Sequence, residues 1–135
     1  MRANTEHVTI NVDHRHLFAF LADPGNLPKW AVGFCRAIRR DGDRWFVQTP
    51  QGEVAIRYLT NPNLGTIDFY ISLGPGIEVA AFSRIMPNGN GSEYVFTQFQ
   101  ASSISDDVFE AQVRALKEEL VVLRALMHAQ AACPA

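Results

Sequence analysis

The stretch that decides the fold is DDVFEAQVRALKEELVVLRALMHAQA, residues 106–131. Its length predicts one helix of about 26 residues, or roughly 39 Å at the rise of an α-helix. Two polar side chains, Gln112 and Glu119, fall inside the apolar arc of this helix. Six apolar side chains recur at alternating steps of four and three, which places them on one face: Phe109, Val113, Leu116, Leu120, Leu123 and Met127.

The segment before this helix has the pattern of short antiparallel strands. Turns rich in Gly, Pro, Asn and Asp interrupt it, and such short connections join antiparallel neighbours. A single long helix that follows a run of strands suggests a sheet curled around it. The expected strands are residues 36–40, 45–49, 53–60, 66–73, 78–86 and 92–100.

The N-terminal part predicts one further strand and two short helices. Residues 7–12 alternate apolar and polar side chains, as a half-buried strand does. Asp13 is a good N-cap for a short helix whose apolar face contains Leu17, Phe18 and Leu21. Residues 23–25 (Asp-Pro-Gly) end that helix, and residues 26–30 predict a second helical turn.

The composition is that of one globular domain. The chain has 135 residues, of which 47% are hydrophobic and 19% charged. Its net charge of −2 argues against nucleic acid as a partner, because binding phosphates needs a basic stripe. The densest basic stretch, residues 36–44, is diluted by Asp41 and Asp43.

Nothing in the sequence indicates insertion into a membrane or a secretory signal. No apolar run approaches the roughly 18 residues that a membrane span needs. The two cysteines, Cys35 and Cys133, form no CxxC pair and no nucleophile motif, so we interpret both as structural or incidental. A reducing cytoplasm is the expected location.

Two motifs carry a resemblance to a known group of proteins: DPGNLPKW at residues 23–30 and RIMPNGNGSEYVFTQF at residues 84–99. With this order of elements, the chain resembles the START-like superfamily. That group includes birch-pollen-allergen-like proteins, steroidogenic lipid-transfer domains and bacterial polyketide cyclase/dehydrase-like proteins. A fold alone does not assign an activity.

The resemblance implies an α+β helix-grip fold over nearly the whole chain. We expect one START-like domain, residues 1–135, with a core of about residues 5–131. A curved seven-stranded antiparallel sheet would wrap around the long C-terminal helix, with two short helices after the first strand. An apolar cavity would lie between the sheet and the helix.

The leading functional hypothesis is binding of a small hydrophobic molecule, of lipid, polyketide or aromatic type, in this cavity. If Glu93 faces water, alternation places Tyr94, Phe96 and Gln98 inside. Gln98 and Glu119 would orient the ligand by hydrogen bonds. The alternative for each aromatic residue is ordinary core packing. The candidate ligand-binding residues are Trp30, Phe34, Trp45, Tyr58, Phe69, Phe96, Gln98, Gln112, Leu116 and Glu119.

Two other functional hypotheses stay open. A carboxylate in an apolar cavity has a raised pKa, so Glu119 could be the acid/base of a cyclase or dehydratase, with Tyr58 as second candidate. The alternative is that Glu119 lies at the margin of the arc, bonded to a strand or an N-terminal helix. The third hypothesis is an interaction or stress-response module without a ligand, and a homodimer fits all three.

The sequence predicts no metal site and no cofactor. His14 and His16 are two positions apart on a short helix, about 200° around its axis, so they do not converge on one ion. The glycine-containing turns lie between strands and open no helix, so they form no phosphate-binding loop.

Overall fold

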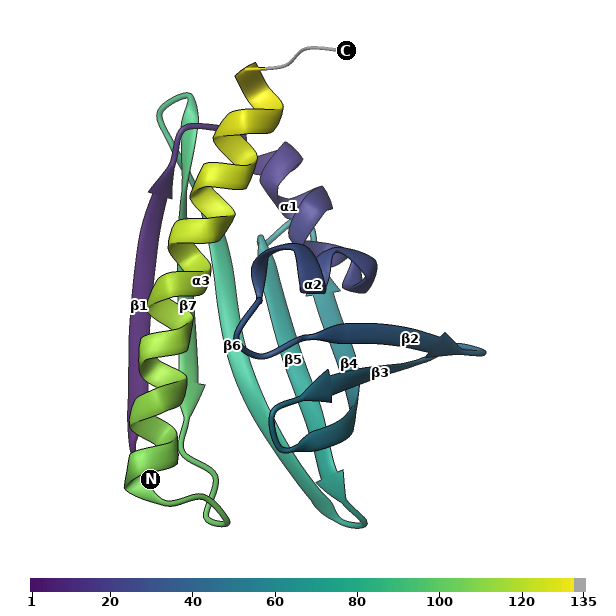
Figure 1. Cartoon of the computed structure of the whole chain (residues 1–135). Helices are drawn as coiled ribbons and strands as arrows, with labels where there is room; N and C mark the ends of the chain where they lie inside the picture. The colour runs from purple at the N-terminus through teal and green to yellow at the C-terminus, as the bar shows by residue number, and fades with distance from the viewer. Residues whose placement is uncertain (133–135) are drawn as a thin grey trace.

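The computed structural model describes residues 1–132 and shows a curved sheet with a long helix across its inner face (Figure 1). Cys133 lies outside the described residues. The helix, α3, spans Asp106–Ala132. The seven strands are β1 (Ala3–Ile10), β2 (Ala37–Asp41), β3 (Arg44–Thr49), β4 (Gly52–Asn61), β5 (Thr66–Gly74), β6 (Ile77–Asn88) and β7 (Gly91–Phe99).

The strands form one antiparallel sheet in the order β1-β7-β6-β5-β4-β3-β2. Strands β2 to β7 follow one another as a meander, and β1 pairs with β7 at the far edge. The predicted helix-grip α+β fold is confirmed, including its seven antiparallel strands and its long C-terminal helix.

The short helices after β1 are α1 (His14–Ala22), the 3-10 turn η1 (Pro24–Asn26) and α2 (Leu27–Trp30). Asp13 caps α1 as predicted, since its carboxylate accepts the amide hydrogen of Arg15 at 2.9 Å. Phe20 is buried beside the predicted Leu17 and Leu21, whereas Phe18 is only partly buried.

Strand β1 differs from the prediction of residues 7–12, because it begins at Ala3 and ends at Ile10. Its first half pairs with the end of β7, from Ala3 opposite Phe99 onward. These residues are mostly polar, so no apolar–polar alternation marks them in the sequence, although their exposure alternates in the structure. Their side chains bond to β7 instead: Asn4 Nδ2 donates to Gln98 Oε1 at 2.8 Å.

The core lies between the sheet, α3 and the short helices. Five of the six apolar residues predicted on α3 are buried, and Val113 is half-buried. The buried residues on the inner face of the sheet include Val47, Ile56, Ile67, Phe69, Ile85 and Tyr94. Burial of such side chains is the main contribution to stability.

Helix α3 does not cover the inner face evenly. Its backbone approaches β1 and α2 most closely, and the sheet diverges from it toward β4 (Figure 1). Inner-face side chains of β3, β4 and β5 therefore keep part of their surface exposed, namely Trp45, Val54, Tyr58 and Ile71. Among residues 1–132, no helix combines the length and the apolar composition that crossing a membrane requires.

Candidate functional site

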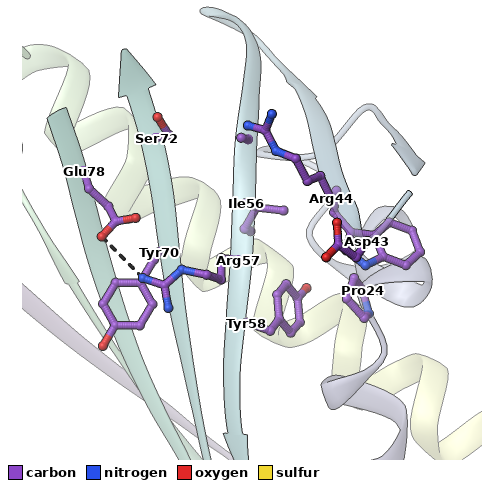
Figure 2. Close-up of a pocket in the computed structure, with 11 residues that line it drawn as sticks. Pro24, Asp43, Arg44, Ile56, Arg57, Tyr58, Tyr70, Ser72 and Glu78 are labelled. Carbon is purple, nitrogen blue, oxygen red and sulfur yellow. Dashed lines mark hydrogen bonds and ion pairs between the residues drawn. The ribbon is translucent and has the colours of Figure 1, made fainter. Parts of the chain in front are cut away.

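A pocket of ≈ 460 Å³ lies at the edge of β4, where β3 stops pairing with it (Figure 2). Strand β3 pairs with β4 only from Trp45 opposite Ile56 to Thr49 opposite Gly52. Residues 57–61 of β4 pair with β5 alone. The β2–β3 hairpin turns away from β4 at this point (Figure 1), and the pocket lies there.

The inner wall of the pocket is apolar and aromatic. Trp45, Ile56 and Tyr58 come from the inner face of β3 and β4, and Pro24 of η1 lies opposite (Figure 2). The Tyr58 ring meets Phe69 edge to face, with 4.8 Å between ring centroids. Burial raises the pKa of Tyr58, so its hydroxyl stays protonated. Within residues 1–132 this hydroxyl has no hydrogen-bond partner, so it can donate to a bound molecule.

The remaining wall of the pocket is polar. The Arg57 guanidinium lies 4.3 Å from the centroid of the Tyr70 ring and 3.5 Å from a carboxylate oxygen of Glu78 (Figure 2). Both charged side chains are about half exposed, so this ion pair adds little stability. Asp43 and Arg44 complete the rim.

A row of aromatic rings leads from the pocket into the core. Phe69 contacts Phe96, with centroids 5.5 Å apart, and Phe96 contacts Tyr94 at 6.3 Å. Tyr94 in turn meets the Trp30 ring edge to face at 6.4 Å. Trp30 and Phe69 are 3% and 4% exposed, so both are core residues, whereas Phe96 keeps part of its surface exposed.

The hydroxyl of Tyr94 is the polar group in this row that sequence reasoning did not select. Tyr94 is fully buried, and its hydroxyl has no hydrogen-bond partner within residues 1–132. The neighbouring Ser83 hydroxyl donates to the carbonyl of Ile67 at 2.7 Å. Burial raises the pKa of Tyr94. The alternation along residues 92–100 already placed Tyr94 inside the sheet. That position could have marked its hydroxyl as a candidate, because a buried phenol needs a hydrogen-bond partner.

Glu119 is buried on α3, with 6% exposure. Its Oε2 atom accepts the amide hydrogens of Gly33 at 3.1 Å and Phe34 at 3.0 Å. Burial raises its pKa from the ordinary 4.5 to about 7, although the two amide bonds oppose this shift. Glu119 thus connects α3 by hydrogen bonds to the segment that follows α2. It is not among the residues that line the pocket.

The other polar candidates connect α3 with the sheet. Gln98 lies on the inner face, and its Nε2 atom donates to the backbone carbonyl of Gln112 at 3.5 Å. Leu116 is buried, and Phe34 and Gln112 are half-buried. Of the predicted ligand-binding residues, the pocket therefore brings together Trp45 and Tyr58, and the others lie in the core or beside α3.

Cys35 is a free buried thiol near Glu119. Its pKa is raised to about 11, chiefly by burial and further by the charge of Glu119. In residues 1–132 no three His, Cys, Asp or Glu side chains are arranged to hold a metal ion.

The sequence matches no protein-family model and no curated protein significantly. Solved structures do share its fold. The Aha1 dimer from Colwellia psychrerythraea superposes with a TM-score of 0.72 at 14% identity, over 94% of this chain and 96% of that chain. The protein Ara h 8.0201 has a TM-score of 0.68 at 16% identity, over 95% of this chain and 98% of that chain.

A third structure is the di-domain ARO/CYC BexL from the BE-7585A biosynthetic pathway. It has a TM-score of 0.70 at 12% identity and aligns with 93% of this chain, but with only 46% of its own length. Similarity at these identities shows the fold. The chain therefore has the same helix-grip fold as these structures, as the resemblance drawn from the two sequence motifs implied.

Proposed function

We propose that this protein binds a small hydrophobic molecule, of lipid, polyketide or aromatic type, on the inner face of its sheet, with access at the edge of β4. The observation that supports this most directly is the pocket of ≈ 460 Å³ with Trp45, Ile56 and Tyr58 on its inner wall. Pockets for small molecules typically measure about 300–1,000 Å³ and combine apolar walls with a few polar groups.

The binding free energy would come mainly from apolar burial, at about 25 cal/mol per Å². The partly exposed Val54, Ile71 and Phe96 extend the apolar surface beyond the pocket. The free hydroxyl of Tyr58 would orient a carbonyl or hydroxyl of the ligand. A ligand that reaches α3 would also meet Gln98 and Gln112. The ARO/CYC of a biosynthetic pathway, which shares this fold, is consistent with a polyketide-like ligand.

We further propose that the whole chain acts as one START-like domain and works in the cytoplasm. Cys35 is a free thiol, which is consistent with a reducing compartment. A cyclase or dehydratase activity is the second candidate, favoured by the pKa of about 7 of the buried Glu119. It requires Glu119 to leave its bonds with Gly33 and Phe34, so turnover that survives in Glu119→Gln would remove Glu119 from the mechanism.

The binding proposal can be tested with the neutral fluorescent probe N-phenyl-1-naphthylamine. Trp45→Ala removes one wall of the pocket, and we expect it to weaken probe binding by about tenfold or more, equivalent to ~1.4 kcal/mol. Phe46→Ala is the matched control, because Phe46 is the neighbouring half-buried aromatic residue on the opposite face of β3. Equal affinities of both variants and the wild type would contradict the proposal.

Native mass spectrometry of the freshly purified protein gives an independent test. A co-purified small molecule, lost on denaturation and depleted in Trp45→Ala, would support binding at this pocket. The mass of that molecule would also identify its chemical class.

A further inference from the structure

The outer face of β5 and β6 exposes aromatic side chains where a sheet facing water is normally polar. Tyr70 and Phe82 meet edge to face with 6.4 Å between ring centroids, and Phe82 meets Phe99 at 5.9 Å. Phe82 is 41% exposed, and Leu59 beside this row is 54% exposed. Contiguous exposed apolar surface commonly marks an interaction site.

The charges on this face have an ordered arrangement. We define the outer patch by its six central residues: Asp68 and Tyr70 on β5, and Glu78, Ala80, Phe82 and Arg84 on β6. The strand register sets Asp68 opposite Phe82 and Tyr70 opposite Ala80. The midpoint between these two rows is the pair formed by Phe69 and Ala81.

Consider a two-fold axis that runs perpendicular to the strands, passes over this midpoint and relates two copies of the chain with their outer faces together. The outer patch would then be complementary to itself. Arg84 lies three positions after Ala81, and Glu78 lies three positions before it. Arg84 of one copy would therefore face Glu78 of the second copy, and Glu78 would face Arg84. Phe82 and Ala80 lie one position on either side, so a large side chain would meet a small one. Tyr70 would face Asp68 of the second copy, where its hydroxyl can donate to the carboxylate.

We propose that a second copy of this chain docks on the outer patch to form a symmetric dimer, in which Arg84 of each copy pairs with Glu78 of the other. A two-fold interface requires one surface to complement itself, and this arrangement of opposite charges and of large and small side chains does so. The proposal does not rest on ligand binding, since Phe82 and Arg84 lie outside the pocket, although Tyr70 and Glu78 of the patch also line its polar wall.

The charged groups of the patch are free to make these contacts. Within residues 1–132, Arg84 and Asp68 take part in no ion pair. Glu78 is near Arg57 at 3.5 Å through Oε1, which leaves its second oxygen for another guanidinium. The patch carries both signs of charge, so a nucleic acid, which would need a uniformly basic surface, fits it poorly.

The expected dimer is weak. The sheet curves around α3, so two outer faces would touch along a strip only a few strands wide (Figure 1). We expect such a strip to bury less than the ~800 Å² per partner of a standard stable interface. We therefore expect a reversible dimer with a dissociation constant in the micromolar to millimolar range.

Charge reversal tests this pairing. Sedimentation velocity from about 10 µM to about 1 mM should show the wild-type chain forming dimers over this range. Arg84→Glu and Glu78→Arg alone place like charges opposite each other, so each should weaken dimerisation by about tenfold or more. The double variant Arg84→Glu/Glu78→Arg restores opposite charges and should recover the dimer. Arg36→Glu, an exposed position outside the patch, is the charge-matched control.

A second pair of variants tests the apolar part. Phe82→Ser should shift the chain to monomer, whereas Leu64→Ser, at an exposed apolar residue in a turn, should not. A wild-type chain that stays monomeric at about 1 mM, or single and double charge variants that dimerise equally, would overturn the proposal. Arg84→Glu and Phe82→Ser change no residue that lines the pocket, so both should bind the probe as the wild type does. Failure of the dimer in these two variants therefore leaves the ligand proposal standing.

Discussion

Glu119 of α3 accepts the amide hydrogen of Phe34 through Oε2 at 3.0 Å, and this bond joins the final helix to the segment that follows α2. The same oxygen accepts from Gly33. Within residues 1–132 no cation pairs with this buried carboxylate. A buried carboxylate held only by neutral donors is expensive to ionise, which explains why its pKa rises to about 7.

This raised pKa predicts that stability depends on pH through Glu119. The unfolded chain titrates Glu119 near 4.5 and the folded protein near 7, so between these values the folded state binds more protons. The stabilisation from Glu119 is therefore complete below pH 4.5 and is lost as pH rises through about 7. Glu119→Gln cannot ionise, so its free energy of unfolding should rise relative to wild type between pH 5 and pH 8, by about 3 kcal/mol at most.

Urea unfolding of both proteins at several pH values measures this difference. Glu110→Gln is the matched control, because Glu110 is an exposed glutamate on the same helix and does not contribute to the raised pKa of Glu119. Its free energy of unfolding should follow that of the wild type with pH. Parallel pH profiles for wild type and Glu119→Gln would show that Glu119 titrates at its ordinary pKa.

Gly65 and Gly42 provide a matched test of backbone approach. Both have a positive φ, +72° and +64°. A Cβ at Gly65 would collide with the carbonyl oxygen of Ile85, whereas a Cβ at Gly42 would meet nothing within 4 Å. We expect Gly42→Ala to cost about 1 kcal/mol for the left-handed conformation alone. Gly65→Ala should cost roughly 2 kcal/mol more, because β6 must move away.

Urea unfolding at neutral pH compares these two variants with wild type. The amide of Ile85 donates to the carbonyl of Gly65 at 2.8 Å, so the collision would also disturb this bond. Equal losses of unfolding free energy in the two variants would mean that β6 moves to accommodate the added methyl group with no further loss of stability.

Much of the fold was predictable from periodicity. The apolar residues at steps of four and three on α3 and the alternating residues on β3 to β6 are mostly the ones that the structure buries. Their pattern in the sequence therefore predicts these elements. The first half of β1 was not predictable in this way. Its side chains are polar on both faces, and Asn4 and Thr5 are bonded to Gln98 and Thr97 of β7, far away in sequence.

The site was predictable only in part. Alternation placed Trp45 and Tyr58 on the inner face, where both line the pocket. The pocket itself exists because β3 stops pairing with β4 beyond Trp45 and Ile56, and no local pattern encodes that point. The sequence showed that Glu119 interrupts the apolar arc of the final helix. It could not show the partners of Glu119, because these are the backbone amides of Gly33 and Phe34, which any residue type would provide.

Cys35 should be an unreactive thiol in the folded protein. It is 2% exposed, and its Sγ atom donates to the carbonyl of Ala37 at 3.4 Å. With its pKa raised to about 11, only about one molecule in a thousand would carry the reactive thiolate at pH 8. In a Cys133→Ser background, labelling by 5,5′-dithiobis(2-nitrobenzoate) should be at least about 100-fold slower than in urea. Equal rates would show that the segment around Cys35 opens readily.

Removing the hydroxyl of Tyr94 should not destabilise the protein. This hydroxyl is buried and has no partner within residues 1–132, so folding loses its hydrogen bond to water without replacement. Such an unsatisfied group costs about 1–3 kcal/mol, and we expect Tyr94→Phe to raise the free energy of unfolding by up to about 1 kcal/mol. Tyr70→Phe, on the outer face, is the control and should change it little. A loss above about 1 kcal/mol in Tyr94→Phe would instead require an internal water molecule bonded to the phenol.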